Sequence, residues 1–331
     1  MSVIYVESRV LNHPRTRTLL ERIGQHKTII ECDHYREIFN RKSQSFRIQK
    51  QHPALILAEK PSSRVLPTPP GFGIGGQKNY YFSHLLNCPY DCRYCFLQGM
   101  YQSAHYVLFV NYEDFQSDIV TVLEEHQDEV VTFFSGYDSD SLAFNPNTQF
   151  IENFIPFFEK HPRALLELRT KSANVKSLLN CQPIQNAVVA FSMTPDSISR
   201  QVEHRVPKLS QRLKAMKQLQ VAGWRIGLRF DPLIYTDNFQ ALYDQLLTDI
   251  FSSIDSSLVH SVSTGLLRFP EKMYQKITAM YPKDKLLAHP LEVNKKIVSY
   301  SKAREIDMLN SFHKKIAQYV PDTSIFKCSA D

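Results

Sequence analysis

The sequence predicts an α/β fold, a partial (β/α)6 TIM-like barrel with a small N-terminal α/β subdomain. Two observations support this. From residue 80 onward, apolar runs alternate with amphipathic helical stretches, a pattern typical of a parallel sheet with right-handed crossovers. Polar residues also recur at the C-terminal ends of nearly every run, where parallel α/β folds place their chemistry, and this favours a barrel over a flat sheet. The six runs are residues 80–86, 130–136, 164–172, 186–193, 224–234 and 258–269.

Residues 1–79 are predicted to form the N-terminal subdomain and a linker. The segments IYVES, TIIECDHYREIF and ALILAEK have strand character, and 14–23 is predicted as a helix with its apolar residues on one face. The linker PSSRVLPTPPGFGIGGQK is rich in proline and glycine. It contains a G-x-G-x-x-G pattern (Gly71, Gly73, Gly76), but prolines precede it and no helix follows, so it is not a dinucleotide-binding motif.

Residues 80–280 are predicted to form the barrel, and 281–331 a C-terminal extension of helix and strand. Helices are expected between the strands and after the last of them. The expected helices are 113–125, 149–159, 209–221, 239–254, a segment after Pro270 (EKMYQKITAMY) and 304–319. The final segment, SIFKCSAD, is predicted as a short strand.

The composition of the 331 residues is that of a globular enzyme with a net charge of +6. No apolar run reaches the roughly 18 residues of a membrane span, and the first residues lack a secretory signal. The six cysteines do not form a disulfide framework, which indicates a reducing cytoplasm. Basic residues concentrate in 14–50 and 283–315, as expected for either solvated helix faces or a surface that binds a polyanion.

Three cysteines lie within eight residues, Cys88, Cys92 and Cys95, at C-x3-C-x2-C spacing. Three thiolates do not complete a structural zinc site, but they suit a cubane [4Fe–4S] cluster in which one iron keeps an open position. Two alternatives remain: a zinc knuckle with His84 or His105 as fourth ligand, or unrelated buried thiols.

Polar residues follow five of the predicted strands on the edge shared with the cysteine loop. They are Ser135-Gly136-Tyr137-Asp138, Arg169-Thr170-Lys171-Ser172, Phe191-Ser192-Met193-Thr194, Arg229-Phe230-Asp231-Pro232, and Ser263-Thr264 with Arg268. One such residue is ordinarily a helix cap. Five sets in register predict the lining of a pocket.

The cysteine loop, with Tyr94 before and Phe96 after the third cysteine, resembles the cluster motif of the radical S-adenosylmethionine (SAM) superfamily. Nearly the whole chain also resembles the spore photoproduct lyase family. The matching motifs are YREIFNR, ALILAEK, CPYDCRYCFLQG, SGYDSDSLAFNP, a TK pair, FSMTP, the Arg200, Glu203, Arg205 run and RFDP.

The resemblance implies a radical SAM barrel, a carbon–carbon lyase activity and a set of site residues. Cys88, Cys92 and Cys95 would hold a [4Fe–4S] cluster whose fourth iron binds SAM. Ser135 and Gly136 would meet the amino end of SAM, and Lys171 and Ser192 its carboxylate and ribose. SAM cleavage would give a 5′-deoxyadenosyl radical that abstracts hydrogen from a methylene-bridged thymine dimer in DNA. The implied partners are UV-damaged DNA and a reducing electron donor such as flavodoxin or ferredoxin, and the implied state is a cytoplasmic monomer.

The chain departs from the family pattern at the step that returns hydrogen. Where the spore enzymes carry a hydrogen-donor cysteine, this chain has Tyr137, and where they carry a relay tyrosine it has Phe96, which has no O–H group. Tyr137 and Tyr94 are therefore the candidate catalytic hydrogen donors, with a pocket-wall aromatic as the alternative for Tyr137. Cys181 is expected at the opposite, N-terminal side of the barrel, and the sequence does not place Cys328.

Two further functions are compatible with these departures. One is a radical SAM enzyme that acts on another modified nucleic acid, a peptide or a small molecule. The other is a non-enzymatic protein that binds nucleic acid and carries a structural metal in the cysteine loop; it predicts zinc instead of iron and salt-sensitive DNA affinity.

Overall fold

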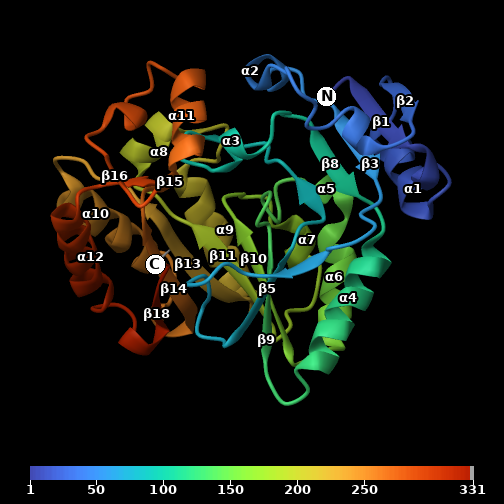
Figure 1. Ribbon diagram of the computed structural model, residues 1–331. Coiled ribbons are helices and arrows are strands. Elements are labelled where there is room, and N and C mark those ends of the chain that lie inside the picture. The colour runs from blue at the N-terminus through green and yellow to red at the C-terminus, as the bar shows by residue number, and fades with distance from the viewer. Residues whose placement is uncertain (329–331) are drawn as a thin grey trace.

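The computed structural model describes residues 1–328, and its centre is an eight-stranded sheet curled into a half barrel (Figure 1). The strand order is β18-β14-β13-β11-β10-β9-β5-β4. Six neighbouring strands run parallel, as predicted: β5 (Lys78–Phe82), β9 (Val131–Ser135), β10 (Ala164–Thr170), β11 (Ala187–Ser192), β13 (Arg225–Leu233) and β14 (Val259–Leu266). The sheet gains an antiparallel edge strand, β4 (Val65–Pro67), and a parallel one, β18 (Ile325–Lys327).

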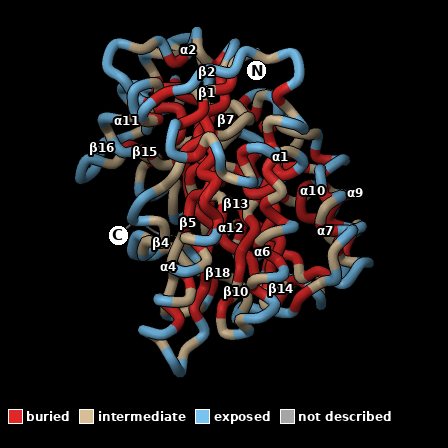
Figure 2. Tube along the Cα trace, turned by 90° about the vertical axis from the view of Figure 1, so that its right-hand side faces the viewer, coloured by how far each residue is buried: buried red, intermediate tan, exposed pale blue. Residues whose placement is uncertain are grey.

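The two strands that flank β10 are buried along their whole length because both faces of the sheet are covered there. Every residue of β9 and of β11 is buried. Continuous burial of this kind explains why their sequences, VTFFS and AVVAFS, are apolar runs without alternation. Figure 2 shows this buried centre as a red zone through the sheet.

Helices wrap the outer face of the half barrel and supply its outer core layer (Figure 1). Phe150, Phe154 and Phe158, one face of α6 (Phe150–Glu159), are fully buried and pack around Phe82 of β5. The other covering helices are α4 (Tyr112–Glu125), the single-turn α7 (Lys176–Leu179), α9 (Leu209–Val221), α10 (Phe239–Phe251) and α12 (Lys302–Ile316).

The N-terminal subdomain is a second sheet, with the order β2-β1-β3-β8-β6. Its first three strands are the predicted ones, and α1 (Pro14–Ile23) is the predicted helix. The strands are β1 (Val3–Glu7), β2 (Thr28–Cys32), β3 (Leu55–Ala58), β6 (Leu85–Leu86) and β8 (Tyr106–Phe109). The boundary at residue 79 does not separate the two sheets cleanly. Strand β4 precedes residue 79 but belongs to the barrel sheet, whereas β6 and β8 follow it but belong to the N-terminal sheet.

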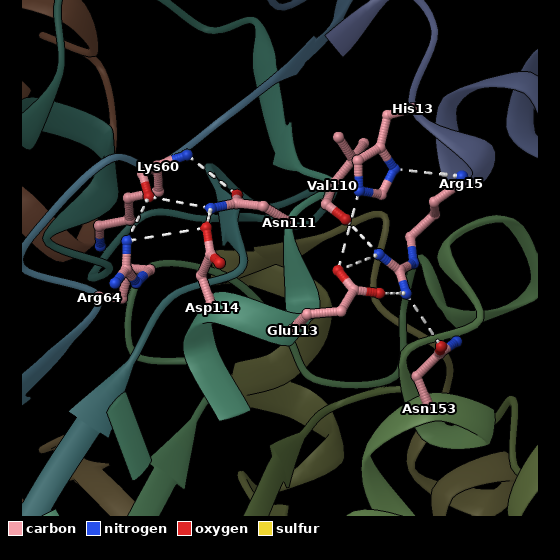
Figure 3. A network of polar contacts seen from close by, with 9 residues as sticks. All are labelled: His13, Arg15, Lys60, Arg64, Val110, Asn111, Glu113, Asp114 and Asn153. Atoms are coloured by element: carbon pink, nitrogen blue, oxygen red, sulfur yellow. Dashed lines mark hydrogen bonds and ion pairs between the residues drawn. The ribbon is translucent and has the colours of Figure 1, made fainter. Parts of the chain in front are cut away.

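Two polar contacts join the N-terminal subdomain to the barrel through α4 (Figure 3). Arg15 of α1 binds Glu113 with both terminal nitrogens, at 2.7 and 3.2 Å, and donates to Asn153 of α6 at 3.1 Å. Asn111, just before α4, exchanges two hydrogen bonds of 3.0 Å with the backbone of Lys60. These contacts fix α1 and the segment after β3 against the barrel, so the subdomain holds one position relative to the cysteine loop.

A small C-terminal unit lies beside the cysteine loop. It contains β15 (Arg268–Pro270), β16 (Glu292–Asn294) and β17 (Ile297–Ser299) as an antiparallel sheet, and α11 (Glu271–Met280). Helix α11 packs on α3 (Leu97–Met100), which follows the cysteine loop. The strand predicted for SIFKCSAD is β18, although residues 329–331 lie outside the described part of the chain. Within the part described, no helix is both long and apolar enough to cross a membrane.

Candidate active site

A cavity of about 620 Å³ lies at the C-terminal ends of the barrel strands. Its wall includes all nine residues predicted from the sequence to form the site. They are Cys88, Cys92, Cys95, Tyr94, Ser135, Gly136, Tyr137, Lys171 and Ser192. Residues separated by more than 100 positions in the chain thus face one space, while their individual roles remain predictions.

The cysteine loop runs from β6 through β7 (Asp91–Cys92) to α3 and is held by a neighbouring strand. Cys92 pairs with Glu203 of β12 (Glu203–His204) in an antiparallel ladder. The Cys95 amide donates to the Cys92 carbonyl at 3.1 Å, which closes the turn between these two cysteines. The short α3 then carries the chain back under α11.

The environment of the three thiols fits a metal cluster. Burial, together with the charge of the neighbouring cysteines, raises the pKa of Cys88 and Cys92, and burial raises that of Cys95. Thiolates in such a place need a cation to be stable, and a bound iron–sulfur cluster would supply that charge. Three soft thiolate ligands are also the set that leaves a cubane cluster one open iron.

Neither histidine of the zinc-knuckle alternative lines the cavity that the three cysteines share. His84 is 2% exposed and stacks on Phe150 with ring centroids 3.9 Å apart, so it is a core residue. His105 accepts a hydrogen bond from the Ala54 amide through Nδ1. Among residues 1–328, no three His, Cys, Asp or Glu side chains converge closely enough to enclose a single metal ion.

A polar layer behind the cysteine loop was not predicted from the sequence. The Lys50 ammonium lies 2.7 Å from Asp91 and 3.1 Å from the Gln98 amide oxygen. Gln98 in turn donates to the Cys92 carbonyl at 3.0 Å. Burial raises the pKa of Asp91, but Lys50 and Arg93 outweigh it and lower that pKa to about 2. Gln98 belongs to the CFLQG motif, whereas nothing in the sequence links Lys50 to this loop.

Asp140 organises the turn after β9. Its carboxylate accepts hydrogen bonds from the amides of Leu142 (3.0 Å), Ala143 (2.9 Å) and Lys171 (2.7 Å) and from the Thr170 hydroxyl (2.7 Å). Its bonds to Thr170 and Lys171 tie the segment that follows Ser135 and Gly136, the residues expected to meet the amino end of SAM, to the end of β10.

Gly136 is required by this turn for two reasons. It has a φ of +81°, and a Cβ atom there would lie 2.6 Å from Ser141 Oγ. Ser135 points its hydroxyl into the barrel, where it contacts Ser141 Oγ at 2.9 Å and donates to the Glu167 carbonyl at 2.9 Å. The part of this turn that a ligand can reach is therefore mainly backbone, which suits recognition of a small polar group.

Lys171, directly after β10, and Ser192, the last residue of β11, line the cavity. The Lys171 ammonium lies 5.5 Å from the centre of the Tyr94 ring. Ser192 Oγ lies 3.5 Å from Arg169 Nε, and its carbonyl accepts a hydrogen bond of 2.9 Å from Arg212. A cation and a hydroxyl on adjacent strands are suited to a ligand that carries both a carboxylate and a sugar.

The two candidate hydrogen donors differ in their surroundings. Tyr94 is buried, and its hydroxyl donates to Glu203 behind the loop. Tyr137 stacks on Tyr81 with ring centroids 4.3 Å apart and lies 5.6 Å from Phe96 and 5.9 Å from Phe72. Burial raises the pKa of Tyr137, so its hydroxyl stays protonated and retains a hydrogen to give. The Tyr94 hydroxyl is thus bound to a carboxylate, whereas Tyr137 lies among aromatic rings, which favours Tyr137 as the hydrogen donor.

The far rim of the cavity carries two arginines that share one carboxylate. Asp231 lies 3.7 Å from Arg169 and 3.9 Å from Arg268. Arg268 also donates to the Cys328 thiol at 3.3 Å, which places the cysteine that sequence reasoning could not locate. Cys328 comes there because its amide bonds to Thr264 of β14 beyond the end of β18, a long-range pairing that no local pattern reveals.

Comparison with known proteins identifies relatives over the whole chain. The spore photoproduct lyase family model matches residues 1–326. The spore photoproduct lyase of Bacillus subtilis (strain 168) is 22% identical over 292 residues, covering 86% of this chain and 83% of the relative. That of Clostridium acetobutylicum is 23% identical over 210 residues, covering 63% of this chain and 62% of the relative, less than two thirds of its length.

Solved structures share the fold. A spore photoproduct lyase mutant with bound AdoMet and dinucleoside spore photoproduct superposes with a TM-score of 0.84 at 18% identity, covering 100% of this chain and 98% of that one. A second mutant, with a cysteine replaced by serine, gives a TM-score of 0.85 at 18% identity, with 99% and 98% covered. These likenesses confirm the predicted partial barrel. The chain belongs to the spore photoproduct lyase family.

Proposed function

We propose that this protein is a radical SAM lyase that uses a [4Fe–4S] cluster and SAM to reverse a methylene-bridged thymine dimer in DNA. The observation that supports it best is the single cavity shared by the three cysteines and by Ser135, Gly136, Lys171 and Ser192. A relative in the same family has been solved with both AdoMet and a dinucleoside spore photoproduct bound.

The roles of the protein's own residues follow from their positions. Cys88, Cys92 and Cys95 would hold the cluster, which, when present, supplies the electron that cleaves SAM to methionine and a 5′-deoxyadenosyl radical. The turn at Ser135 and Gly136 would bind the amino end of SAM. Lys171 and Ser192 would orient its carboxylate and ribose, and the aromatic wall would exclude water from the substrate radical.

The direct test is turnover of a defined lesion. The reduced, iron-loaded chain is incubated with SAM and a dinucleotide spore photoproduct, and the repaired dinucleotide with two intact thymines is measured by mass spectrometry. Formation of the repaired dinucleotide is expected. SAM cleavage without repaired dinucleotide would overturn the proposal.

Tyr137 at the position of the family's donor cysteine favours one second candidate, a radical SAM enzyme with a different substrate. In deuterated solvent, substrate-dependent formation of deuterium-free 5′-deoxyadenosine without any DNA requirement would support it.

Lys171→Ala is expected to weaken SAM binding by about 10- to 100-fold, because a charged hydrogen bond to the carboxylate contributes about 1.5–3 kcal/mol. Equilibrium binding to the iron-loaded chain by calorimetry measures this. Lys176→Ala is the matched control, since Lys176 is exposed on α7. Unchanged SAM affinity in Lys171→Ala would remove Lys171 from the SAM site.

Tyr137→Phe is expected to leave SAM cleavage intact but lower the yield of thymine per SAM consumed, because the substrate radical then lacks the phenolic hydrogen. Phenylalanine keeps the ring that stacks on Tyr81. Cys328→Ser is the companion variant, since the Cys328 thiol contacts Arg268, a residue of the cavity wall. A loss confined to Cys328→Ser would contradict the assignment of Tyr137.

The partners follow from the same chemistry. A flavodoxin or ferredoxin would reduce the cluster, and DNA would approach the basic surface of the N-terminal subdomain. A lesion weakens its own duplex, which lowers the cost of moving it into the cavity. The chain would act as a monomer in the cytoplasm, where its cysteines stay reduced.

A further inference from the structure

A buried carboxylate, Glu203, lies directly behind the cysteine loop. The residue is 5% exposed, and its side chain is fully enclosed. Four donors surround its two oxygens: the Tyr94 hydroxyl, Thr194 Oγ1 at 3.0 Å, Ser199 Oγ at 2.6 Å and Arg212 Nη2 at 3.0 Å. The Glu203 carboxylate is therefore the meeting point of the cysteine loop, the end of β11, and the helices α8 (Asp196–Val202) and α9.

The backbone at Glu203 also holds the loop. Glu203 pairs with Cys92, and His204 with Asp91, in the two-stranded β12–β7 ladder. One residue earlier, the Val202 carbonyl accepts a hydrogen bond of 2.8 Å from the Arg93 amide. Main-chain and side-chain contacts thus act on the same turn, the one that carries Cys92 and Cys95.

Arg212 links the Glu203 carboxylate to the opposite wall of the cavity. Its guanidinium binds Glu203 through Nη2 and donates from Nη1 to the Ser192 carbonyl at 2.9 Å. Its side chain, like that of Glu203, has no exposed surface. The pair therefore links two walls that would hold the cluster and SAM respectively.

Fold stability alone does not account for this arrangement. Apolar residues of similar volume usually stabilise a core as well as a buried ion pair does, because removing two charges from water is costly. A buried ion pair does, however, impose a defined geometry, because its hydrogen bonds fix the angles and distances between the groups that it joins. Here those groups are Tyr94, between two cysteines, and the backbone of Ser192.

We propose that Glu203 and Arg212 are positioning residues that fix Tyr94 and the Cys92–Cys95 turn relative to Ser192, and so set the distance between cluster and SAM. The inference rests on the proposed function. Neither residue is expected to touch the substrate, and Tyr94, on this view, orients the loop through its bond to Glu203.

Two conservative variants of the full chain test the proposal. Glu203→Gln removes the charge, and Tyr94→Phe removes only the hydroxyl while leaving the other three donors on Glu203. Both are loaded with iron under anaerobic conditions, reduced, and measured by electron paramagnetic resonance with and without SAM. We expect changed cluster signals in both variants and SAM affinity lowered by about tenfold, the lower end of the effect of losing an outer-shell partner.

The matched control is Glu167→Gln, which alters the other fully buried ion pair, Glu167–Arg229. It should lower the midpoint of thermal unfolding but leave the resonance signal and SAM affinity unchanged. Wild-type signals and affinity in Glu203→Gln and Tyr94→Phe would overturn the proposal. If Glu203→Gln does not fold, Tyr94→Phe decides alone. An iron-free wild-type chain would contradict the proposed function itself.

Discussion

Replacing Cys92 with alanine is expected to abolish both iron–sulfur absorbance and SAM cleavage. Cys92 is buried in the ladder with β12, between the other two cysteines of the loop. With two thiolates left, a cubane cluster lacks a third anchor, and the described residues that line the cavity include no histidine to replace it. Iron content should fall from about four per chain toward zero.

Iron analysis, absorbance near 400 nm and formation of 5′-deoxyadenosine measure this loss. Cys181→Ala is the control because Cys181 lies before the N-terminal end of β11, on the opposite side of the barrel. That variant should keep full iron and SAM cleavage. A Cys92→Ala chain that retained the cluster would remove Cys92 from the ligand set, and zinc in the wild-type chain would support the non-enzymatic alternative.

Replacing Arg229 with methionine is expected to lower the free energy of unfolding by about 3–5 kcal/mol, because it leaves a buried carboxylate without its partner. Arg229 and Glu167 are each 1% exposed and are joined by two hydrogen bonds, of 2.8 and 3.1 Å, inside the barrel. Arg229 also donates to the carbonyl and hydroxyl of Ser261 at 3.0 Å each. Urea unfolding of the iron-free chain measures the loss.

Two further variants distinguish the effect of breaking a buried ion pair from the effect of removing any charge. In the double variant Glu167→Met with Arg229→Met, neither charge remains buried, and most of the stability should return. Arg200→Ala breaks the exposed pair with Asp196 on α8 and should cost less than about 1 kcal/mol. An Arg229→Met chain no less stable than Arg200→Ala would contradict the expectation.

The barrel could be predicted from local patterns because parallel strands at its centre are enclosed on both faces. Complete burial leaves its mark as a continuous apolar run, as in β9 and β11. The outer strands β4 and β18 each have only three residues, none of them buried, so no comparable pattern marks them as barrel strands. The position of Cys328 beside Arg268 depended on this unpredicted β18 pairing.

Some residues of the candidate site could likewise be predicted from the sequence, and others could not. Cys88, Cys92 and Cys95 are close in sequence, and polar residues at parallel strand ends must meet at one edge, so the sequence could bring nine candidate residues to one cavity, while their roles stay predictions. Lys50, Asp140 and Arg212 were missed as site residues because their contacts join elements far apart in the chain.

The sequence by itself thus determined the barrel and the cysteine loop, since each depends on residue type and short spacing. Only the tertiary structure decided which groups face one another. It bonded the Tyr94 hydroxyl to Glu203, set Tyr137 among aromatic rings and brought Cys328 to Arg268. The physical reason is that hydrogen bonds and ring packing depend on three-dimensional proximity, which separation along the chain does not encode.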